Sequence, residues 1–247
     1  MKTRIDKLLV ERGLAPSRER AQALILAGKV LVNDQKVEKA GANVEHEAAI
    51  RLLGNDLRYV SSGGLKLERA LEHWQIDVAG RICMDIGAST GGFTDCLLQH
   101  GAARVIAVDT GYGQIDVRLR NDSRVRLLEK TNARYLRRED IGEAVEFAAM
   151  DVSFISATLV LPAVMKAAGE ELGGMVVLVK PQFEAGREQV GKGGIVRDPA
   201  VQQAAVERVR TALRDLGWGN TDVIESPILG GEGNREFLVY ARRSSTP

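Results

Sequence analysis

The sequence is poor in the residues that build disulfide frameworks and metal centres. It contains only two cysteines and three histidines among 247 residues. Cys83 and Cys96 form no C-x-x-C pair, and His46, His73 and His100 are scattered without the spacing of metal ligands. We therefore expect two buried thiols rather than a disulfide, and we expect no metal site.

Long apolar runs and a strong charge imbalance are missing as well. No apolar run approaches the length of a membrane span, and the first residues lack the apolar core of a signal peptide. Lysine and arginine total 34 against 33 aspartate and glutamate, so the net charge of +1 selects no class of partner. We expect a cytoplasmic protein that contacts no membrane and has no stable protein partner.

The first forty residues form a segment with its own charge and pattern, carrying nine basic and five acidic side chains. Ile5, Leu8 and Leu9 recur at the spacing of an amphipathic helix, and Ser17 is a candidate N-cap for a second helix. The β-rich segments KVLVND and QKV predict a tight hairpin around Asn33. The sequence therefore predicts a small α+β domain here.

Two arginines of this segment lie where helix electrostatics disfavours them. Arg18 and Arg20 are near the start of the second predicted helix, where the macrodipole repels cations, which hints at a use beyond helix stability. The patterns R-x-D-x-L-L, S-R-x-x-A and G-x-V-x-V-N, over residues 4–9, 17–21 and 28–33, resemble the S4 RNA-binding domain. The resemblance implies RNA contacts by Arg4, Lys7, Arg18, Arg20 and Lys29. A solvated basic helical hairpin without an RNA role is the alternative.

Turn-forming residues separate this segment from the rest of the chain. They occur in GND at residues 54–56 and in SSGG at residues 61–64, and an apolar helical pattern resumes at Leu65. We therefore expect an N-terminal domain over residues 1–57, a linker over residues 58–64 and a second domain over residues 65–247.

Strand-like apolar runs alternate with helical patterns in the second domain, which predicts a mostly parallel sheet with helices on both faces. The runs are Ile82 to Ile86, Val105 to Val108, Ala148 to Val152, Met175 to Val179 and Phe237 to Tyr240. Ligands of such sheets bind beyond the carboxyl ends of the strands. The polar residues at or near these ends are Asp85, Asp109, Asp151 and Lys180.

The loop D-I-G-A-S-T-G-G, which begins at Asp85, lacks the dinucleotide fingerprint G-x-G-x-x-G. Asp109 closes the next strand, at a position from which a carboxylate can bind ribose hydroxyls, so the pair of features predicts an adenosine ligand. Asp85 would repel a dinucleotide pyrophosphate but tolerates an amine and a sulfonium, which favours S-adenosylmethionine over NAD. A glycine turn with two incidental acids is the alternative.

The loop resembles the first motif of the class I methyltransferases. The resemblance implies a cofactor site made by Asp85, Gly87, Ala88, Ser89, Gly91, Gly92, Phe93, Asp109, Asn132 and Asp151. Phe93 could instead pack beneath the loop, and Asn132 could equally be a turn residue.

Four further polar residues, Lys66, Asp151, Lys180 and Glu236, resemble the Lys-Asp-Lys-Glu tetrad of the RrmJ/FtsJ-like ribose 2′-O-methyltransferases. The phrases GGLKLERAL, MDVSFIS and VKPQFEAGRE, together with the S4-like segment, make the whole chain similar to the TlyA family of rRNA 2′-O-methyltransferases, whose members are also called hemolysins. This implies a class I (Rossmann-like) α/β sheet with a small N-terminal S4 domain. It also implies S-adenosylmethionine as cofactor and rRNA or ribosomal subunits as partner, with cytidine as target.

The tetrad suits the chemistry that the family implies. A ribose hydroxyl is a poor nucleophile, so a base and in-line positioning help its attack on a methyl group. Lys180 serves as a base only if partly deprotonated, which a neighbouring ammonium such as Lys66 would favour, while Asp151 and Glu236 hold these groups in place. A non-catalytic RNA-binding or ribosome-assembly protein and, less favoured, a membrane-lytic hemolysin are the alternatives.

Two regions leave their roles open. Family members often carry arginine where this chain has Ser62 and an aromatic such as tryptophan in the linker where it has Tyr59. This departure from the family pattern concerns any coupling of RNA engagement to cofactor affinity through the linker. The segment Gln182 to Pro199, which carries Arg187, Lys192 and Arg197, is either a substrate-facing loop or a long solvated loop.

Overall fold

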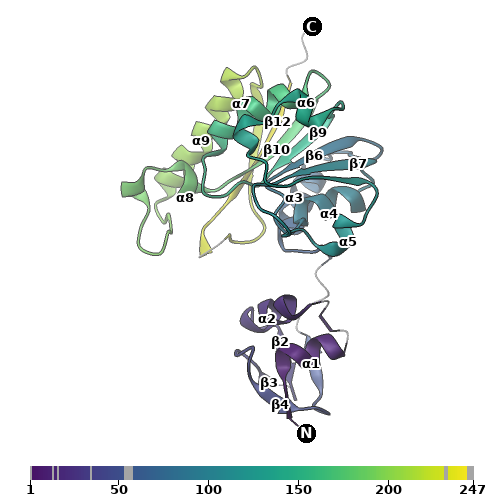
Figure 1. Ribbon diagram of the computed structural model, residues 1–247. Coiled ribbons are helices and arrows are strands. Elements are labelled where there is room, and N and C mark those ends of the chain that lie inside the picture. Colours follow the sequence, from purple (N-terminus) through teal and green to yellow (C-terminus); the bar gives the residue numbers. More distant parts are fainter. Residues whose placement is uncertain are drawn as a thin grey trace. The chain divides into compact units, whose positions relative to one another are not determined.

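The computed structural model describes residues 2–12, 14–15, 17–33, 35–52, 58–230 and 233–243, and the chain divides into two compact units (Figure 1). The first unit is Met1–Arg58 and the second is Tyr59–Pro247. Of the turn residues expected to separate them, 54–56 lie outside the described residues. The helix expected to resume at Leu65 begins two residues earlier, at Gly63.

The first unit packs two helices against short antiparallel strands. Its elements are β1 (Lys2–Arg4), α1 (Ile5–Glu11), α2 (Arg18–Leu26), β2 (Val30–Val32), β3 (Gln35–Lys36), β4 (Asn43–Glu45) and β5 (Ile50–Leu52). Strand β1 pairs with β4, and β2 lies between β3 and β5. The expected hairpin is confirmed as β2–β3, with Asn33 at a φ of 49° in its turn; Asp34 lies outside the described residues.

Apolar periodicity correctly identified the buried face of α1, since Ile5, Leu8 and Leu9 are fully buried. Ile25 of α2 is fully buried as well. Ser17 caps α2 as predicted, since its side chain accepts a hydrogen bond from the Arg20 backbone N–H.

The second unit contains a seven-stranded sheet in the order β11-β12-β10-β9-β6-β7-β8. Its strands are β6 (Ile82–Ile86), β7 (Arg104–Val108), β8 (Val125–Leu128), β9 (Phe147–Met150), β10 (Gly174–Val179), β11 (Asn220–Glu225) and β12 (Phe237–Arg242). Strands β10, β9, β6, β7 and β8 are mutually parallel, whereas β12 is antiparallel to both β10 and β11. The mostly parallel sheet is confirmed, and β11 is an edge strand that the sequence pattern had not revealed.

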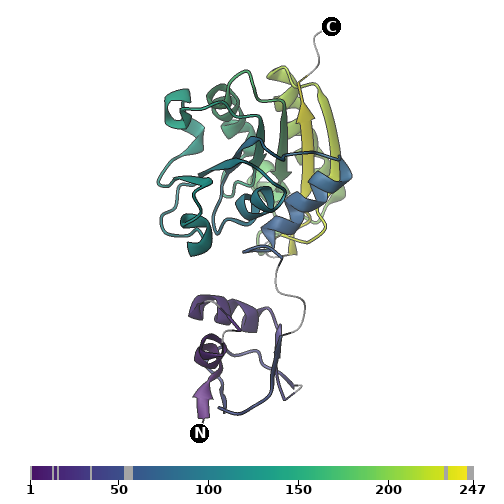
Figure 2. The same cartoon turned by 90° about the vertical axis from the view of Figure 1, so that its right-hand side faces the viewer.

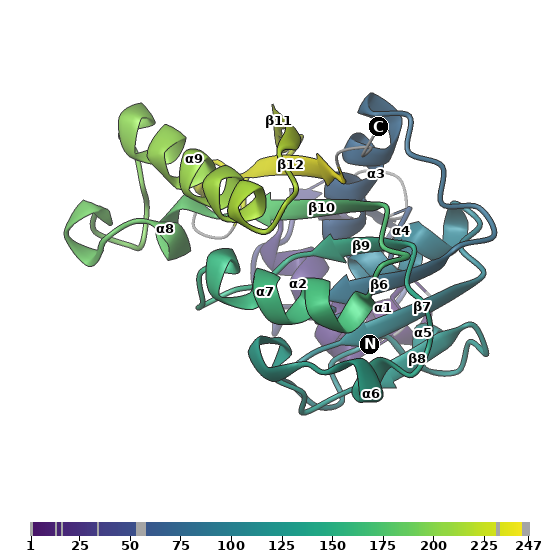
Figure 3. The same ribbon diagram turned by 90° about the horizontal axis from the view of Figure 1, so that it is seen from above.

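Helices cover both faces of this sheet (Figures 1 and 3). The α-helices are α3 (Gly63–His73), α4 (Gly92–Gln99), α5 (Val117–Arg120), α6 (Arg138–Ile141), α7 (Ala157–Ala168), α8 (Pro181–Glu184) and α9 (Pro199–Asp215). Two short 3₁₀ helices, η1 (Ala133–Tyr135) and η2 (Arg187–Gln189), lie between them. Figure 2 shows the blue helix α3 lying against the yellow strand β12.

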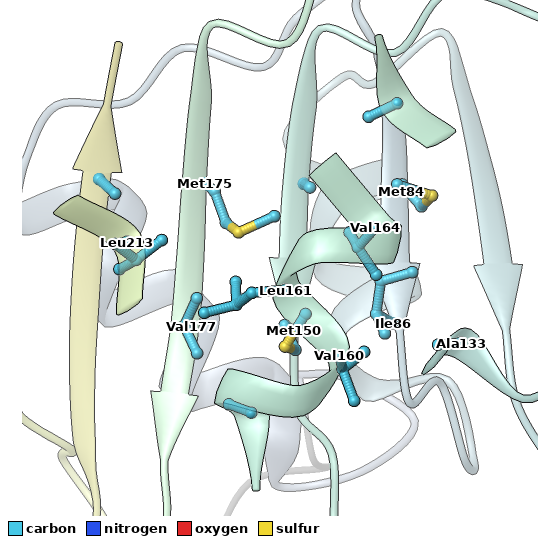
Figure 4. Close-up of a cluster of buried hydrophobic side chains, with 14 of the residues drawn as sticks. Met84, Ile86, Ala133, Met150, Val160, Leu161, Val164, Met175, Val177 and Leu213 are labelled. Carbon is cyan, nitrogen blue, oxygen red and sulfur yellow. The ribbon is translucent and has the colours of Figure 1, made fainter. Parts of the chain in front are cut away.

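Alternation along the strands divides the core into two layers. Met84 and Ile86 of β6 face α7, where Leu161 and Val164 pack on them and on their neighbours (Figure 4). Cys83, which is in sequence phase with Asp85, faces the opposite layer with α3 and α4. Both cysteines are buried free thiols, as expected.

Gly87 is the residue where the end of β6 touches the end of β9. Its φ is +86°, and a Cβ placed there would overlap the backbone carbonyl of Asp151. Because both a left-handed backbone and backbone contact exclude a side chain, only glycine fits this position.

Replacing Gly87 with alanine tests this contact. Gly80 is a matched control, because its φ is +72° but no atom lies within 4 Å of the place that an added Cβ would occupy. We expect Gly80→Ala to lower the free energy of unfolding by about 1–2 kcal/mol, the cost of the left-handed backbone. Gly87→Ala should cost clearly more, because the Asp151 backbone must also move. Urea unfolding measures both, and equal losses would contradict the proposed contact.

Candidate functional site

Polar groups from four neighbouring strands meet at one edge of the sheet. Gly87 follows β6, Asp109 follows β7, Asp151 follows β9 and Lys180 follows β10, and the four strands run parallel. A pocket of about 300 Å³ opens at this edge. Its walls include five of the predicted cofactor residues: Gly87, Ser89, Asp109, Asn132 and Asp151.

Backbone donors hold the Asp109 carboxylate in the pocket wall. Ser89 N–H donates to Oδ2 at 2.8 Å, and Gly111 N–H donates to Oδ1 at 2.6 Å. Each carboxylate oxygen keeps further lone-pair capacity, so Asp109 can still accept hydrogen bonds from a pair of hydroxyls. The glycine loop therefore positions the acid of the next strand as well as forming part of the wall.

Asn132 has the turn role that the sequence allowed, and it also lies in the pocket wall. Its Oδ1 accepts the Arg134 backbone N–H at 3.0 Å, which makes it the N-cap of η1. It also lines the pocket, and its side-chain NH₂ remains as a donor.

Asp85 lies in the core instead of at the pocket wall. Its carboxyl group is fully buried beneath α4, where Thr94 Oγ1 donates to Oδ2 at 2.6 Å, and Oδ1 has no hydrogen-bond partner among the described residues. Burial raises the pKa of Asp85 to about 7. Asp85 was expected to contact the ligand directly, but its side chain is buried and does not line the pocket. The carboxylates that line the pocket are those of Asp109 and Asp151.

Four other predicted cofactor residues are buried and do not line the pocket. They are Ala88, Gly91, Gly92 and Phe93. Phe93 packs in the core layer with Leu67 of α3, and a Cβ on Gly92 would overlap Ser61 Oγ. The packing alternative for Phe93 is the one that the structure displays.

The four tetrad residues form two ion pairs. Lys180 Nζ lies 2.5 Å from Asp151 Oδ1 and donates to Ser153 Oγ at 2.7 Å, while Lys66 Nζ lies 2.5 Å from Glu236 Oε2. Asp151 and Ser153, the two partners of Lys180, both line the pocket. The Lys66 pair is almost completely buried, with the side chains 10% and 2% exposed. Buried charges are tolerated only when paired in this way.

Two aromatic residues next to Lys180 were not singled out from the sequence. Phe154 is 92% exposed, lines the pocket and has a φ of 65°, which is an outlier for a bulky residue. The ring of Phe183 lies 5.2 Å from it. Each follows a strand-end polar residue by three positions, in MDVSF and in VKPQF, and this repeated spacing was the available signal.

In the first unit, two predicted RNA-contact residues have a structural task. Arg4 donates to both oxygens of Asp6 at 3.0 and 2.9 Å, and Arg18 Nε donates to Oδ2 at 2.9 Å. Asp6 is fully buried, and its hydrogen bonds from Arg4 hold the pKa of this carboxyl well below its usual range. The unexpected cation at the start of α2 is therefore explained for Arg18 by its ion pair. Lys7 is exposed, and Arg20 and Lys29 are partly buried.

Metal-binding clusters and membrane-spanning helices are both missing from the described part of the chain. No group of three or more His, Cys, Asp or Glu residues within it is arranged to hold a metal ion. None of its helices combines the length and apolar character that crossing a membrane requires.

Family models match both units. Residues 59–243 match the FtsJ-like methyltransferases, and residues 3–50 match the S4 domain. The 16S/23S rRNA (cytidine-2′-O)-methyltransferase TlyA of Mycobacterium tuberculosis is 47% identical over 242 residues, covering 98% of this chain and 90% of that protein. Hemolysin A of Brachyspira hyodysenteriae is 41% identical over 241 residues, covering 96% and 98%.

Solved structures agree with the expected fold class. A candidate hemolysin from Streptococcus thermophilus matches with a TM-score of 0.78 at 45% identity, covering 100% of this chain and 90% of that one. A candidate S-adenosylmethionine-dependent methyltransferase from Listeria monocytogenes matches with a TM-score of 0.54 at 16% identity, covering 75% and 100%. The second likeness concerns the fold alone, and it confirms the class I sheet.

The burial of Asp85 predicts a pH-dependent contribution to stability. The pKa of Asp85 is about 7 in the folded state, whereas that of an unfolded aspartate is about 3.9. Between these two pH values the folded state keeps the carboxyl proton that the unfolded state has lost. The free energy of unfolding should therefore fall as pH rises between these values, by about 1.4 kcal/mol per unit of pKa difference. Asp85→Asn removes the titration, so the variant should gain stability relative to the parent between about pH 5 and about pH 8. Urea unfolding at both pH values measures this, and a constant difference would show that Asp85 does not titrate there.

Proposed function

The chain belongs to the family of FtsJ-like methyltransferases, and from that premise we propose that it methylates the ribose 2′-hydroxyl of a cytidine in ribosomal RNA. The observation that carries the proposal is the Lys180–Asp151 ion pair at a pocket that Asp109 also lines. A non-catalytic RNA-binding or ribosome-assembly protein is the alternative. Such a protein would have no need to keep two lysine–carboxylate pairs in place, one of them nearly buried.

The pocket suits S-adenosylmethionine as the cofactor. Its lining includes the carboxylate of Asp109, which suits a hydroxyl-bearing ligand and would repel a pyrophosphate, and the carboxylate of Asp151, whose charge Lys180 balances at 2.5 Å. We assign the ribose hydroxyls to Asp109 and the neighbouring wall to Gly87, Ser89 and Asn132. The cofactor, when bound, supplies an activated methyl group; the residues of this chain bind it, orient the hydroxyl and remove a proton.

The two ion pairs divide the remaining work. Lys180, held by Asp151 and Ser153, is assigned to orient the 2′-hydroxyl. In its neutral amine form it would receive the hydroxyl proton as the bond from the ribose oxygen to the methyl group forms and the methyl–sulfur bond breaks. Lys66 and Glu236 lie deeper and keep fixed charges beside that centre. Phe154 offers an exposed aromatic face next to Lys180, on which an unstacked base can rest.

The S4-like first unit is assigned to dock the RNA, with residues 1–57 as the RNA-binding domain and 65–247 as the methyltransferase domain. Lys7 is exposed on α1, and Arg20 and Lys29 add charge at the start of α2 and before β2. The side chains of Arg4 and Arg18 remain 43% and 45% exposed while they pair with Asp6. Since ribosomal RNA is the substrate, we place the activity in the cytoplasm.

A transfer assay tests the proposed function. The protein is incubated with methyl-labelled S-adenosylmethionine and either naked rRNA or separated ribosomal subunits, and the digested RNA is examined for 2′-O-methylcytidine. We expect label in cytidine, and we expect Lys180→Ala to reduce the single-turnover rate about a hundredfold or more. Absence of label from every RNA would refute the enzyme, whereas equal rates for the variant would refute only the role of Lys180.

Charge substitutions in the first unit separate docking from folding. Lys7→Ala should leave the melting temperature unchanged, weaken RNA binding and reduce the slope of log affinity against log salt by about one. Arg18→Ala should instead lower the melting temperature, because it leaves the buried Asp6 with one cation fewer. Filter binding over a salt series and thermal denaturation distinguish the two. An unchanged salt slope for Lys7→Ala would remove Lys7 from the RNA surface.

A further inference from the structure

Two segments that carry the proposed chemistry are joined side by side in the second unit. One is the β9–α7 loop, residues 151–156, and the other is the β10–α8 segment, residues 180–184. Lys180 pairs with Asp151 at one end of this junction, and the ring of Phe183 contacts Phe154 in the middle. The third connection is made by Glu184.

Glu184 is a buried acid, 3% exposed, with no part in the tetrad or in the pocket lining. Its Oε2 accepts a hydrogen bond from Ser156 Oγ at 2.5 Å, and its Oε1 accepts one from Ala157 N–H at 2.7 Å. The two oxygens therefore bind the point where the loop enters α7. The backbone carbonyl of Glu184 accepts a hydrogen bond from Arg208 Nη1 at 2.6 Å, which ties the same residue to α9.

The loop needs such an anchor because the backbone conformation of Phe154 is unfavourable by itself. A phenylalanine at positive φ is strained, and a ring that is 92% exposed gains little packing to offset the strain. Asp151 fixes the loop at its start, since its N–H donates to the Ile86 carbonyl at 2.8 Å. Glu184 fixes the loop at its end.

We propose that Glu184 is a positioning residue for the methyl transfer proposed above: by holding Ser156 and Ala157, it sets the loop conformation that presents Phe154. The proposal rests on the proposed function for its kinetic consequence. Its structural part concerns the loop alone, so a measurement on the free protein can test it separately.

Two substitutions separate the hydrogen bonds from the charge. Glu184→Gln keeps an oxygen for Ala157 N–H and places an NH₂ group opposite Ser156 Oγ, which can accept. Glu184→Ala removes both contacts. Asp122→Ala is the matched control, since Asp122 also accepts a backbone N–H, from Arg124 at 2.9 Å, but lies before the amino end of β8, away from the pocket.

Hydrogen exchange and single-turnover methyl transfer are measured on the full chain with these three variants. We expect Glu184→Ala to speed exchange in residues 151–157 and to slow transfer by about tenfold or more at saturating S-adenosylmethionine and RNA. Glu184→Gln should restore most of both, and Asp122→Ala should change neither. An active parent enzyme whose Glu184→Ala variant keeps its loop protection or its rate would overturn the proposal. A parent without any transfer would instead refute the proposed function.

A second series asks whether Glu184 acts through the loop. If it does, adding Glu184→Ala to Phe154→Ala should slow transfer by a smaller factor than Glu184→Ala does alone, because part of the loop's contribution is already lost. Independent, multiplicative losses would contradict positioning through Phe154 and indicate a general effect on folding.

Discussion

The contact between the Gly87 turn and the backbone of Asp151 is the constraint on which the site depends. With no side chain at Gly87, the end of β6 lies directly against the end of β9, and Asp151 N–H donates to the Ile86 carbonyl. The same turn donates from Gly87 N–H to the Val108 carbonyl at 2.9 Å, which ties in β7. Three strand ends are thereby fixed together, so the residues that follow them face one pocket.

The end of the glycine loop also packs against the start of α3, the helix that carries Lys66. A Cβ on Gly92 would approach Ser61 Oγ and the Gly64 backbone, so the start of α3 rests directly on the start of α4. Lys66 lies within the first turn of α3 and reaches Glu236, 170 positions further along the chain. The glycine loop and the Lys66–Glu236 ion pair are therefore joined through α3, and Gly92 and Phe93 pack against this helix without lining the pocket.

Strand alternation explains both what the sequence could predict and what was misplaced. Asp109, Asp151 and Lys180 were expected at the edge of the sheet because they follow apolar strands, and the parallel strand order brings them there. Asp85 lies one residue inside β6, in phase with Cys83, so its side chain points under α4 instead of into the pocket. Side chains alternate along a strand, so the sequence ICMDI already places Asp85 on the same face as Cys83.

Other features depend on tertiary contacts that no local pattern encodes. The burial of Asp6 with Arg4 and Arg18 joins residues from β1, α1 and α2, and a motif alone does not distinguish such an ion pair from an RNA contact. The positive φ of Phe154 is likewise set by its surroundings, not by the propensity of phenylalanine. The division of the tetrad into two pairs required the register of β12 beside β10.

Calorimetric titration of S-adenosylmethionine tests the central claim, that one edge of the sheet binds the cofactor through Asp109 and holds Lys180 for the chemical step. The account predicts that Asp109→Ala weakens binding about tenfold or more, because charge-assisted hydrogen bonds to the ligand are lost, while Lys180→Ala binds nearly as tightly as the parent. Unchanged affinity in Asp109→Ala, or equal losses in both variants, would contradict it.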